Sequence, residues 1–116
     1  MSADALVYKI CPAALWAAAE ADGAFAGAPV DHADGFIHFS TAAQVAETAA
    51  KHFSGQADLK LVGIHADRLG PALKWEVSRG GALFPHLYAV LDLAAVAFVR
   101  DLPLGEDGRH LFPPLD

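Results

Sequence analysis

Five side chains suited to chemistry lie close together within residues 75–88, on both sides of the glycine pair Gly80-Gly81. They are an indole, a carboxylate, a guanidinium, an imidazole and a phenol: Trp75, Glu76, Arg79, His86 and Tyr88. Groups of these kinds bind anions, transfer protons and stabilise developing charge. Because the glycines predict a hairpin turn, the two arms would bring these side chains together. The segment is therefore the first candidate for a functional site.

Each group in this hairpin also has a purely structural interpretation. Glu76 stands between apolar neighbours in an expected strand, so it is either an exposed edge-strand residue or a carboxylate held by a partner. Arg79 is the candidate partner, and as the only guanidinium of the hairpin it is also the expected anion anchor. The glycine pair has neither Walker spacing nor a Rossmann fingerprint. It is either a loop that a phosphate can approach or a plain hairpin turn.

A second polar motif lies at an expected junction between a strand and a helix. His38 is near the end of the strand, and Ser40 and Thr41 come just before the helix. Helix N-termini present free N–H groups and a partial positive charge, which bind phosphate or carboxylate, and the two hydroxyls add donors. Thr41 followed by Gln44 has the form of a capping box. The alternative is therefore that Thr41 only caps the helix and His38 only belongs to the strand.

The histidine and cysteine pattern does not favour a metal centre. Neither a His-x-x-x-His nor a Cys-x-x-Cys spacing occurs. A site assembled from His38, Glu76 and His86 has no support from spacing, so we assign no metal ligand. Cys11 is the single cysteine and cannot form an internal disulfide, and we expect it to be a buried, inert thiol.

Size and composition predict one compact domain that spans residues 1–116. Hydrophobic residues make up 54% of the chain and charged residues 19%, which is typical of a globular fold. No apolar run approaches the length of a membrane span, and the first residues lack the basic segment of a signal peptide, so a cytoplasmic protein is expected. The formal net charge of −6 argues against broad nucleic-acid binding but is compatible with one small anionic ligand.

The apolar periodicity predicts an α+β fold with small mixed or antiparallel sheets. Two helices come early, most strands come late, and there is no regular alternation of strands and helices. We expect helices over residues 13–21 and 41–53 and a loop over residues 25–34. The expected strands cover residues 5–10, 36–39, 59–65, 73–78, 83–91 and 94–99. The Pro- and Gly-rich residues 102–116 should form a tail on the surface.

In order and spacing, these motifs resemble the domain-of-unknown-function 952 family over residues 6–93. The resemblance is carried by Val7-Tyr8-Lys9-Ile10-Cys11, Trp16, Asp34-Gly35-Phe36-Ile37-His38-Phe39-Ser40-Thr41, Gln44-Val45, Lys74-Trp75-Glu76, Ser78-Arg79-Gly80-Gly81 and Phe84-Pro85-His86-Leu87-Tyr88. It implies a small bacterial cytosolic protein without an established activity. It also implies an ADP-ribosyltransferase-like core, similar to that of the RNA 2′-phosphotransferases that use NAD.

Such a core implies a ligand cleft between two small sheets and a carboxylate that stabilises an oxocarbenium ion. Ile37-His38-Phe39-Ser40 resembles the Val-His-Leu-Ser of the phosphotransferases. Tyr8-Lys9-Ile10 ends the first strand, where polymerase-type enzymes have His-Gly-Thr. The first strand departs from that pattern, and NAD is the cofactor candidate that the similarity to the phosphotransferases implies.

Together, the motifs predict an NAD- or nucleotide-linked transferase or hydrolase, or a degenerate relative, with one anion-binding cleft. One alternative is a non-catalytic module that binds a nucleotide or a small acidic metabolite, and another is a purely structural domain. We expect one small anionic or nucleotide ligand, no membrane contact, and a monomer or weak dimer. His38, Glu76 and Arg79 should border one pocket. Three residues are assigned catalytic roles and five ligand-binding roles: Glu76, His38 and His86, and Ser40, Thr41, Trp75, Arg79 and Tyr88.

Overall fold

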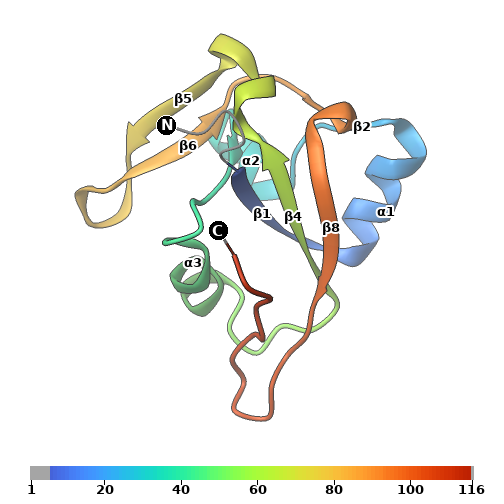
Figure 1. The fold of residues 1–116 in the computed structure, drawn as a ribbon, viewed down its shortest axis with the longest axis vertical. Coiled ribbons are helices and arrows are strands. Elements are labelled where there is room, and N and C mark those ends of the chain that lie inside the picture. Colours follow the sequence, from blue (N-terminus) through green and yellow to red (C-terminus); the bar gives the residue numbers. More distant parts are fainter. Residues whose placement is uncertain (1–5, 116) are drawn as a thin grey trace.

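Two small antiparallel sheets form the framework of the fold, in a computed structural model that describes residues 6–115 (Figure 1). The first sheet has the order β1-β4-β8, with β1 (Leu6–Pro12), β4 (Leu59–His65) and β8 (Val96–Leu102). The second sheet has the order β3-β6-β5, with β3 (Ile37–His38), β6 (Leu83–Leu87) and β5 (Leu73–Val77). A two-stranded ribbon pairs β2 (Ala24–Phe25) with β7 (Leu91–Asp92). The expected α+β class with small antiparallel sheets is confirmed.

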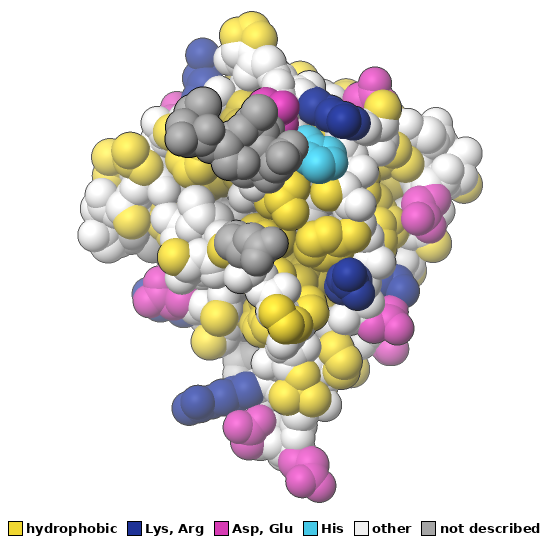
Figure 2. All heavy atoms as spheres, in the orientation of Figure 1, with side chains coloured by type: hydrophobic (Ala, Val, Ile, Leu, Met, Phe, Trp, Pro, Cys, Tyr) yellow, Lys and Arg dark blue, Asp and Glu magenta, His cyan; other side chains and the backbone are white. Residues whose placement is uncertain are grey.

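Within the described residues, three short helices pack around these sheets: α1 (Ala13–Asp22), α2 (Pro29–Asp34) and α3 (Val45–His52). Short 3-10 turns fill connections at Ala66–Arg68, Gly70–Ala72, Arg79–Gly81 and Leu93–Ala95. None of the helices within residues 6–115 is long and apolar enough to span a membrane. On the face seen in Figure 2, apolar side chains gather near the centre, and Lys and Arg side chains are dispersed around them.

The alternation of side chains along β1 divides the core into two apolar clusters. Val7 and Cys11 point to one face of the first sheet, where they pack in a cluster that includes Trp16 of α1. Tyr8 and Ile10 point to the other face. The cluster on that face also contains two residues of α3 and three from β4 and β8: Val45, Ala49, Leu59, Leu61 and Leu102. Because both faces of β1 are covered, any polar side chain on this strand is forced into the interior.

Two of the expected elements are wrong in their boundaries or type. Residues 25–34 were expected to be loop, yet they contain α2, which begins with Pro29 at a position where its missing N–H costs nothing. Asp31 accepts a hydrogen bond from the Ala28 N–H at 2.8 Å, and Gly35 ends the helix with φ +85°. The expected helix 41–53 begins only at Val45.

Most of the remaining boundaries differ by a few residues, whereas β4 has the expected bounds 59–65. The strand expected over 83–91 ends at Leu87 and is followed by the separate β7, and the last strand lies over Val96–Leu102 rather than 94–99. The hairpin turn at Gly80-Gly81 is confirmed, with φ values of +66° and +79° that favour glycine. In the part of the tail that the structure describes, Leu104 and His110 form an isolated bridge.

Candidate functional site

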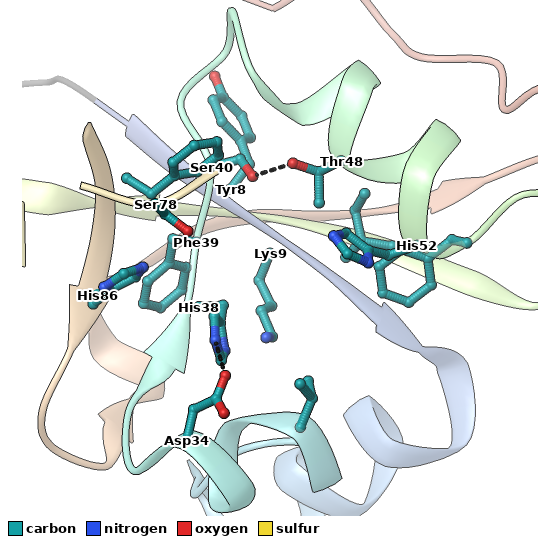
Figure 3. Close-up of a pocket in the computed structure, with 14 residues that line it drawn as sticks. Tyr8, Lys9, Asp34, His38, Phe39, Ser40, Thr48, His52, Ser78 and His86 are labelled. Atoms are coloured by element: carbon teal, nitrogen blue, oxygen red, sulfur yellow. Dashed lines mark hydrogen bonds and ion pairs between the residues drawn. The ribbon is translucent and has the colours of Figure 1, made fainter. Parts of the chain in front are cut away.

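A cavity of about 480 Å³ runs along β1, the edge strand of the first sheet, from α2 at one end to α3 at the other (Figure 3). Strands β3 and β6 of the second sheet form its remaining wall. The polar lining consists of Lys9, Asp34, His38, Ser40, Thr48, His52, Ser78 and His86. The other lining residues are apolar or aromatic: Tyr8, Ile10, Val30, Phe39, Phe53 and Phe84.

Lys9 is buried in this wall and is held by an ion pair. Its position on β1 places the side chain in the interior, with 6% of its surface exposed. Its ammonium group lies 2.9 Å from Oδ2 and 3.0 Å from Oδ1 of Asp31, which α2 supplies. Burial lowers the pKa of Lys9, and the negative charge of Asp31 offsets this only in part. The ion pair explains why α2 is fixed against β1.

Asp31 is the centre of a buried hydrogen-bond network. Besides Lys9 and the Ala28 N–H, its carboxylate accepts a hydrogen bond from the backbone N–H of His38 at 3.1 Å, and its Oδ1 lies 2.6 Å from Nδ1 of the His38 ring. Burial alone would raise the pKa of Asp31. The hydrogen bond from His38, the charge of Lys9 and the Ala28 N–H outweigh burial and hold the pKa at about 2.

The ring of His38 is clamped between two carboxylates. Nδ1 faces Asp31, and Nε2 lies 2.9 Å from Oδ2 of Asp34, which ends α2. A carboxylate accepts hydrogen bonds and does not donate them when ionised, so both contacts can be made at once only by the doubly protonated ring. With a hydrogen on each nitrogen, the ring would be a cation that donates to both carboxylates at once.

His86 is held differently, by a single carboxylate outside the cavity. Its Nδ1 lies 2.8 Å from Oε1 of Glu76 on β5, and the Tyr88 hydroxyl donates to the same oxygen at 2.7 Å. The Tyr88 hydroxyl and His86 lower the pKa of Glu76, and in return the contact raises the pKa of Tyr88. Because an ionised Glu76 can only accept hydrogen bonds, this contact requires a hydrogen on Nδ1 of His86. The neutral ring then carries its lone pair on Nε2.

The register of the second sheet places the two histidines side by side. His38 on β3 is the direct partner of His86 on β6, and their ring centroids are 5.6 Å apart. The Phe36 ring packs against both, at 4.6 Å from His38 and 4.1 Å from His86. Two imidazoles with different carboxylate partners thus line the same cavity, one suited to be a cation and the other to accept a proton.

Ser40 and Thr48 close the α3 end of the cavity. Their hydroxyl oxygens are 2.8 Å apart, and the Ser40 backbone forms an isolated bridge with Tyr8 of β1. The N–H of Thr41 donates to Oε1 of Gln44 at 3.0 Å, which is half of the expected capping box. Because α3 begins only at Val45, Thr41 lies before the helix, and it is not part of the cavity lining.

The structure brings together some of the residues assigned from sequence and separates others. His38, Ser40 and His86 line the cavity, and Glu76 reaches it only through His86. Tyr88 lines a second hollow of about 320 Å³ on the other side of Phe36.

The last two assigned residues do not contribute to the described cavity wall. Trp75 alternates away from its neighbour Glu76, and 47% of its surface is exposed. Arg79 belongs to the turn between β5 and β6, and its side chain lies outside the described part of the structure.

Sequence reasoning missed Lys9, Asp31 and Asp34. The one signal for Lys9 was a charged residue inside the apolar run of the first strand, which predicts a buried ion pair when both faces of the strand are covered. Asp31 and Asp34 gave no comparable signal, because they stood in a segment expected to be loop.

Neither a reactive thiol nor a cluster of metal ligands is found among residues 6–115. Cys11 is fully buried, as expected, and burial raises the pKa of its thiol to about 11, which disfavours the reactive thiolate. Among residues 6–115, no three His, Cys, Asp or Glu side chains are arranged so that they could hold a metal ion.

The low pKa of Asp31 predicts a loss of stability in acid. The pKa falls from an ordinary value of 3.8 to about 2 on folding, so the stabilisation is complete above pH 4 and is lost as the pH falls through 2. The expected contribution is about 2 kcal/mol. Urea unfolding of wild type and Asp31→Asn across this pH range measures it. A difference between the two proteins that does not shrink toward pH 2 would contradict the assignment.

Comparison with known proteins places the chain in a family. Residues 10–99 match the model of the family described as a protein of unknown function, DUF952, and the chain belongs to this family. No curated protein matches it. The crystal structure of CC0527 from Caulobacter crescentus is 54% identical, with a TM-score of 0.88, and the match covers 91% of this chain and 93% of that one. The solution NMR structure of CC0527 is 55% identical, with a TM-score of 0.81 and 90% of each chain covered.

Proposed function

We propose that the chain is a nucleotide-linked transferase or hydrolase whose active site is the cavity beside β1. The observation that carries this proposal is the pair of neighbouring histidines, each oriented by carboxylates and both lining one cavity. Acid–base catalysis needs groups whose protonation states are set by fixed partners, and the two rings have different partners. The cavity volume falls in the range of small-molecule sites, which is about 300–1,000 Å³.

The two histidines would take complementary roles. Nε2 of His86 would accept the proton of an attacking hydroxyl, because Glu76 holds the hydrogen on Nδ1. The His38 imidazolium would stabilise negative charge on the bound phosphate or on the leaving group. Glu76 would then be a positioning residue, and Asp34 is the carboxylate that lines the cavity.

A phosphorylated nucleotide fits the chemistry of the lining. Phe39, Phe53 and Phe84 offer aromatic surface for a base or nicotinamide ring. Among the described side chains of the lining, Lys9 and three histidines can carry positive charge and Asp34 alone is a carboxylate, while Asp31, which is not part of the lining, already pairs with Lys9. This balance favours an anion even though the whole chain is acidic.

NAD is the specific candidate that the family resemblance suggests, and it would enter as a substrate. Two small antiparallel sheets beside one cavity support the proposal of an ADP-ribosyltransferase-like core. Asp34, rather than Glu76, stands at the cavity wall where a carboxylate would stabilise an oxocarbenium ion. ADP-ribose and nicotinamide, tested separately, would show which part of NAD is recognised.

A non-catalytic binding module is the second candidate. Lys9 and His38 are already paired with Asp31 and Asp34, so their charges are compensated before any ligand arrives. A module that binds a ligand without transforming it needs only such a fixed polar wall and no group that transfers a proton. Binding without product formation under prolonged incubation would favour the module over the enzyme.

Ligand binding should raise the melting temperature by several degrees. A ligand present at 100 times its dissociation constant adds roughly 2.7 kcal/mol to the stability of the folded state, which is a large shift for a domain of this size. The measurement is a thermal-shift series with NAD, ADP-ribose, nicotinamide and inorganic phosphate at millimolar concentration.

A pair of matched variants ties the shift to the cavity. Ser78 is exposed and lines the cavity, so Ser78→Trp should block entry, whereas Ser54→Trp places the same indole on an exposed residue outside the lining. The shift should vanish in the first variant and persist in the second. A flat melting temperature across the ligand series in the wild type, or a shift that survives Ser78→Trp, would count against the cavity as the site.

A further inference from the structure

The outer edge of the second sheet is available for pairing. β5 pairs with β6 on one side, and within residues 6–115 no strand pairs with its other side, at the outer edge of the molecule in Figure 1. The N–H of Tyr88 donates to Ala72 and the N–H of Ser78 donates to Ala82, which fixes the alternation of the ladder. The backbone N–H and C=O groups of Trp75 and Val77 must therefore point outward, whereas the Leu73 N–H donates to the Gly70 carbonyl and leaves only the Leu73 C=O for pairing.

The sequence of this edge is complementary to itself. β5 reads Leu73-Lys74-Trp75-Glu76-Val77, with Trp75 at its centre. If a second β5 pairs antiparallel about a two-fold axis at Trp75, each Lys74 lies opposite the partner's Glu76. Leu73 in turn lies opposite the partner's Val77. Opposite charges then meet on one face of the sheet and apolar side chains meet on the other, both of which stabilise neighbouring strands.

The backbone alternation fits the same register. The backbone groups of Trp75 point outward, so a two-fold axis at this residue makes Trp75 and the partner's Trp75 a hydrogen-bonded pair. The N–H of each then donates to the C=O of the other. Lys74 and the partner's Glu76 then form a non-hydrogen-bonded pair, in which side chains approach more closely. A shift by one residue would break both the charge pairing and the hydrogen bonds.

The apolar face of this edge is exposed in a single copy. Trp75 is 47% exposed, Val77 69% and Leu83, the partner of Val77 on β6, 51%. Sheet edges in monomers are usually protected by proline, bulges or inward-pointing charge, but the β5–β6 register runs without interruption over Leu73–Val77. An uninterrupted, apolar and self-complementary edge matches a second copy of the same strand.

We propose that two copies of the chain associate through β5 into a symmetric dimer with one continuous six-stranded antiparallel sheet. The partner's Lys74 would lie beside Glu76, the carboxylate that orients His86. The interface thus borders the candidate site, because Ser78, which follows β5 directly, lines the cavity. This proposal rests on the edge alone and is independent of the proposed function.

Sedimentation velocity of the wild type from micromolar to millimolar concentration should show a monomer–dimer equilibrium. Lys74→Glu replaces two attractive pairs with two repulsive ones and should weaken the dimer by roughly tenfold or more. Trp75→Pro removes the outward N–H at the two-fold axis while leaving the ladder to β6 intact, and should abolish the dimer. Val90→Ser removes a comparably exposed apolar residue, at 57%, away from the edge and should leave dimerisation unchanged.

A charge-swap mixture gives the most specific test. Lys74→Glu and Glu76→Lys should each dimerise more weakly than the wild type, by roughly tenfold or more, but a mixture of the two restores opposite charges at both positions and should form a heterodimer. Recovery of the dimer in the mixture supports the register. A wild type that stays monomeric throughout, or a dimer that persists in both Lys74→Glu and Trp75→Pro, would overturn the proposal and would leave the edge to a foreign strand or to no partner.

Discussion

Replacing Asp31 with Asn should lower the free energy of unfolding by about 3–5 kcal/mol, the usual cost of breaking a buried ion pair. Asn retains the shape of Asp and an acceptor for the Ala28 N–H, so the substitution removes mainly the charge. Lys9 would then be a buried ammonium group without its counter-ion, and the His38 ring would lose one of its two carboxylates. Urea denaturation at neutral pH measures the loss.

A double-mutant cycle separates the ion pair from other effects. Lys9→Met keeps the apolar stem of Lys9 and leaves Asp31 with His38 and two backbone N–H groups, so it should cost less than Asp31→Asn. The double variant should cost less than the sum of the two single variants, because the pair is already broken in each. Costs that simply add, or an Asp31→Asn protein as stable as the wild type, would show that the pair contributes nothing.

His86→Gln should reduce turnover by roughly 10²–10⁴-fold, the usual contribution of a general base, once a substrate is identified. The amide of glutamine retains hydrogen-bonding atoms but cannot take up a proton at neutral pH. Ligand affinity should change little, because His86 would act on the attacking group rather than hold the substrate. Steady-state kinetics with separate measurement of the dissociation constant distinguishes the two effects.

Two control variants distinguish catalysis from support. Glu76→Gln should lower turnover less than His86→Gln and change its pH profile, because a neutral amide in place of the carboxylate no longer fixes the hydrogen on Nδ1 of His86. His65→Gln, at the end of β4 and outside the cavity lining, should have no effect on turnover. Equal turnover in wild type and His86→Gln would remove the proton-transfer role and favour a binding module.

Local sequence patterns were sufficient to predict one buried strand and the turns that end at glycines. The strand predicted over residues 59–65 has the same boundaries as β4. The prediction succeeded because apolar residues run along the whole strand, and most of them are buried. Gly23 ends α1 and Gly80-Gly81 turns the hairpin, in each case with a positive φ that glycine adopts without strain. Such signals depend on a few neighbouring residues and are therefore visible in the sequence.

Elements that depend on distant contacts were not visible. α2 has only six residues, too few to be stable alone, and its Asp31 is fixed by Lys9 from β1, 22 positions earlier in the chain. The sequence predicted that His38 and His86 line one cleft, but it did not predict that they are direct partners on neighbouring strands. Their contact comes from the register between β3 and β6, which no spacing along the chain reveals.

The cavity beside β1 should hold two differently protonated histidines that both meet the ligand. Nitrogen-15 NMR of the histidine rings tests this directly during a titration with ADP-ribose. Before ligand is added, His86 should be protonated on Nδ1 alone and His38 on both nitrogens. Saturation should then shift the ring signals of both while those of His65 and His110 stay unchanged. Ring signals of His38 and His86 that do not respond to saturating ligand, or that respond no more than His65 and His110, would contradict the account.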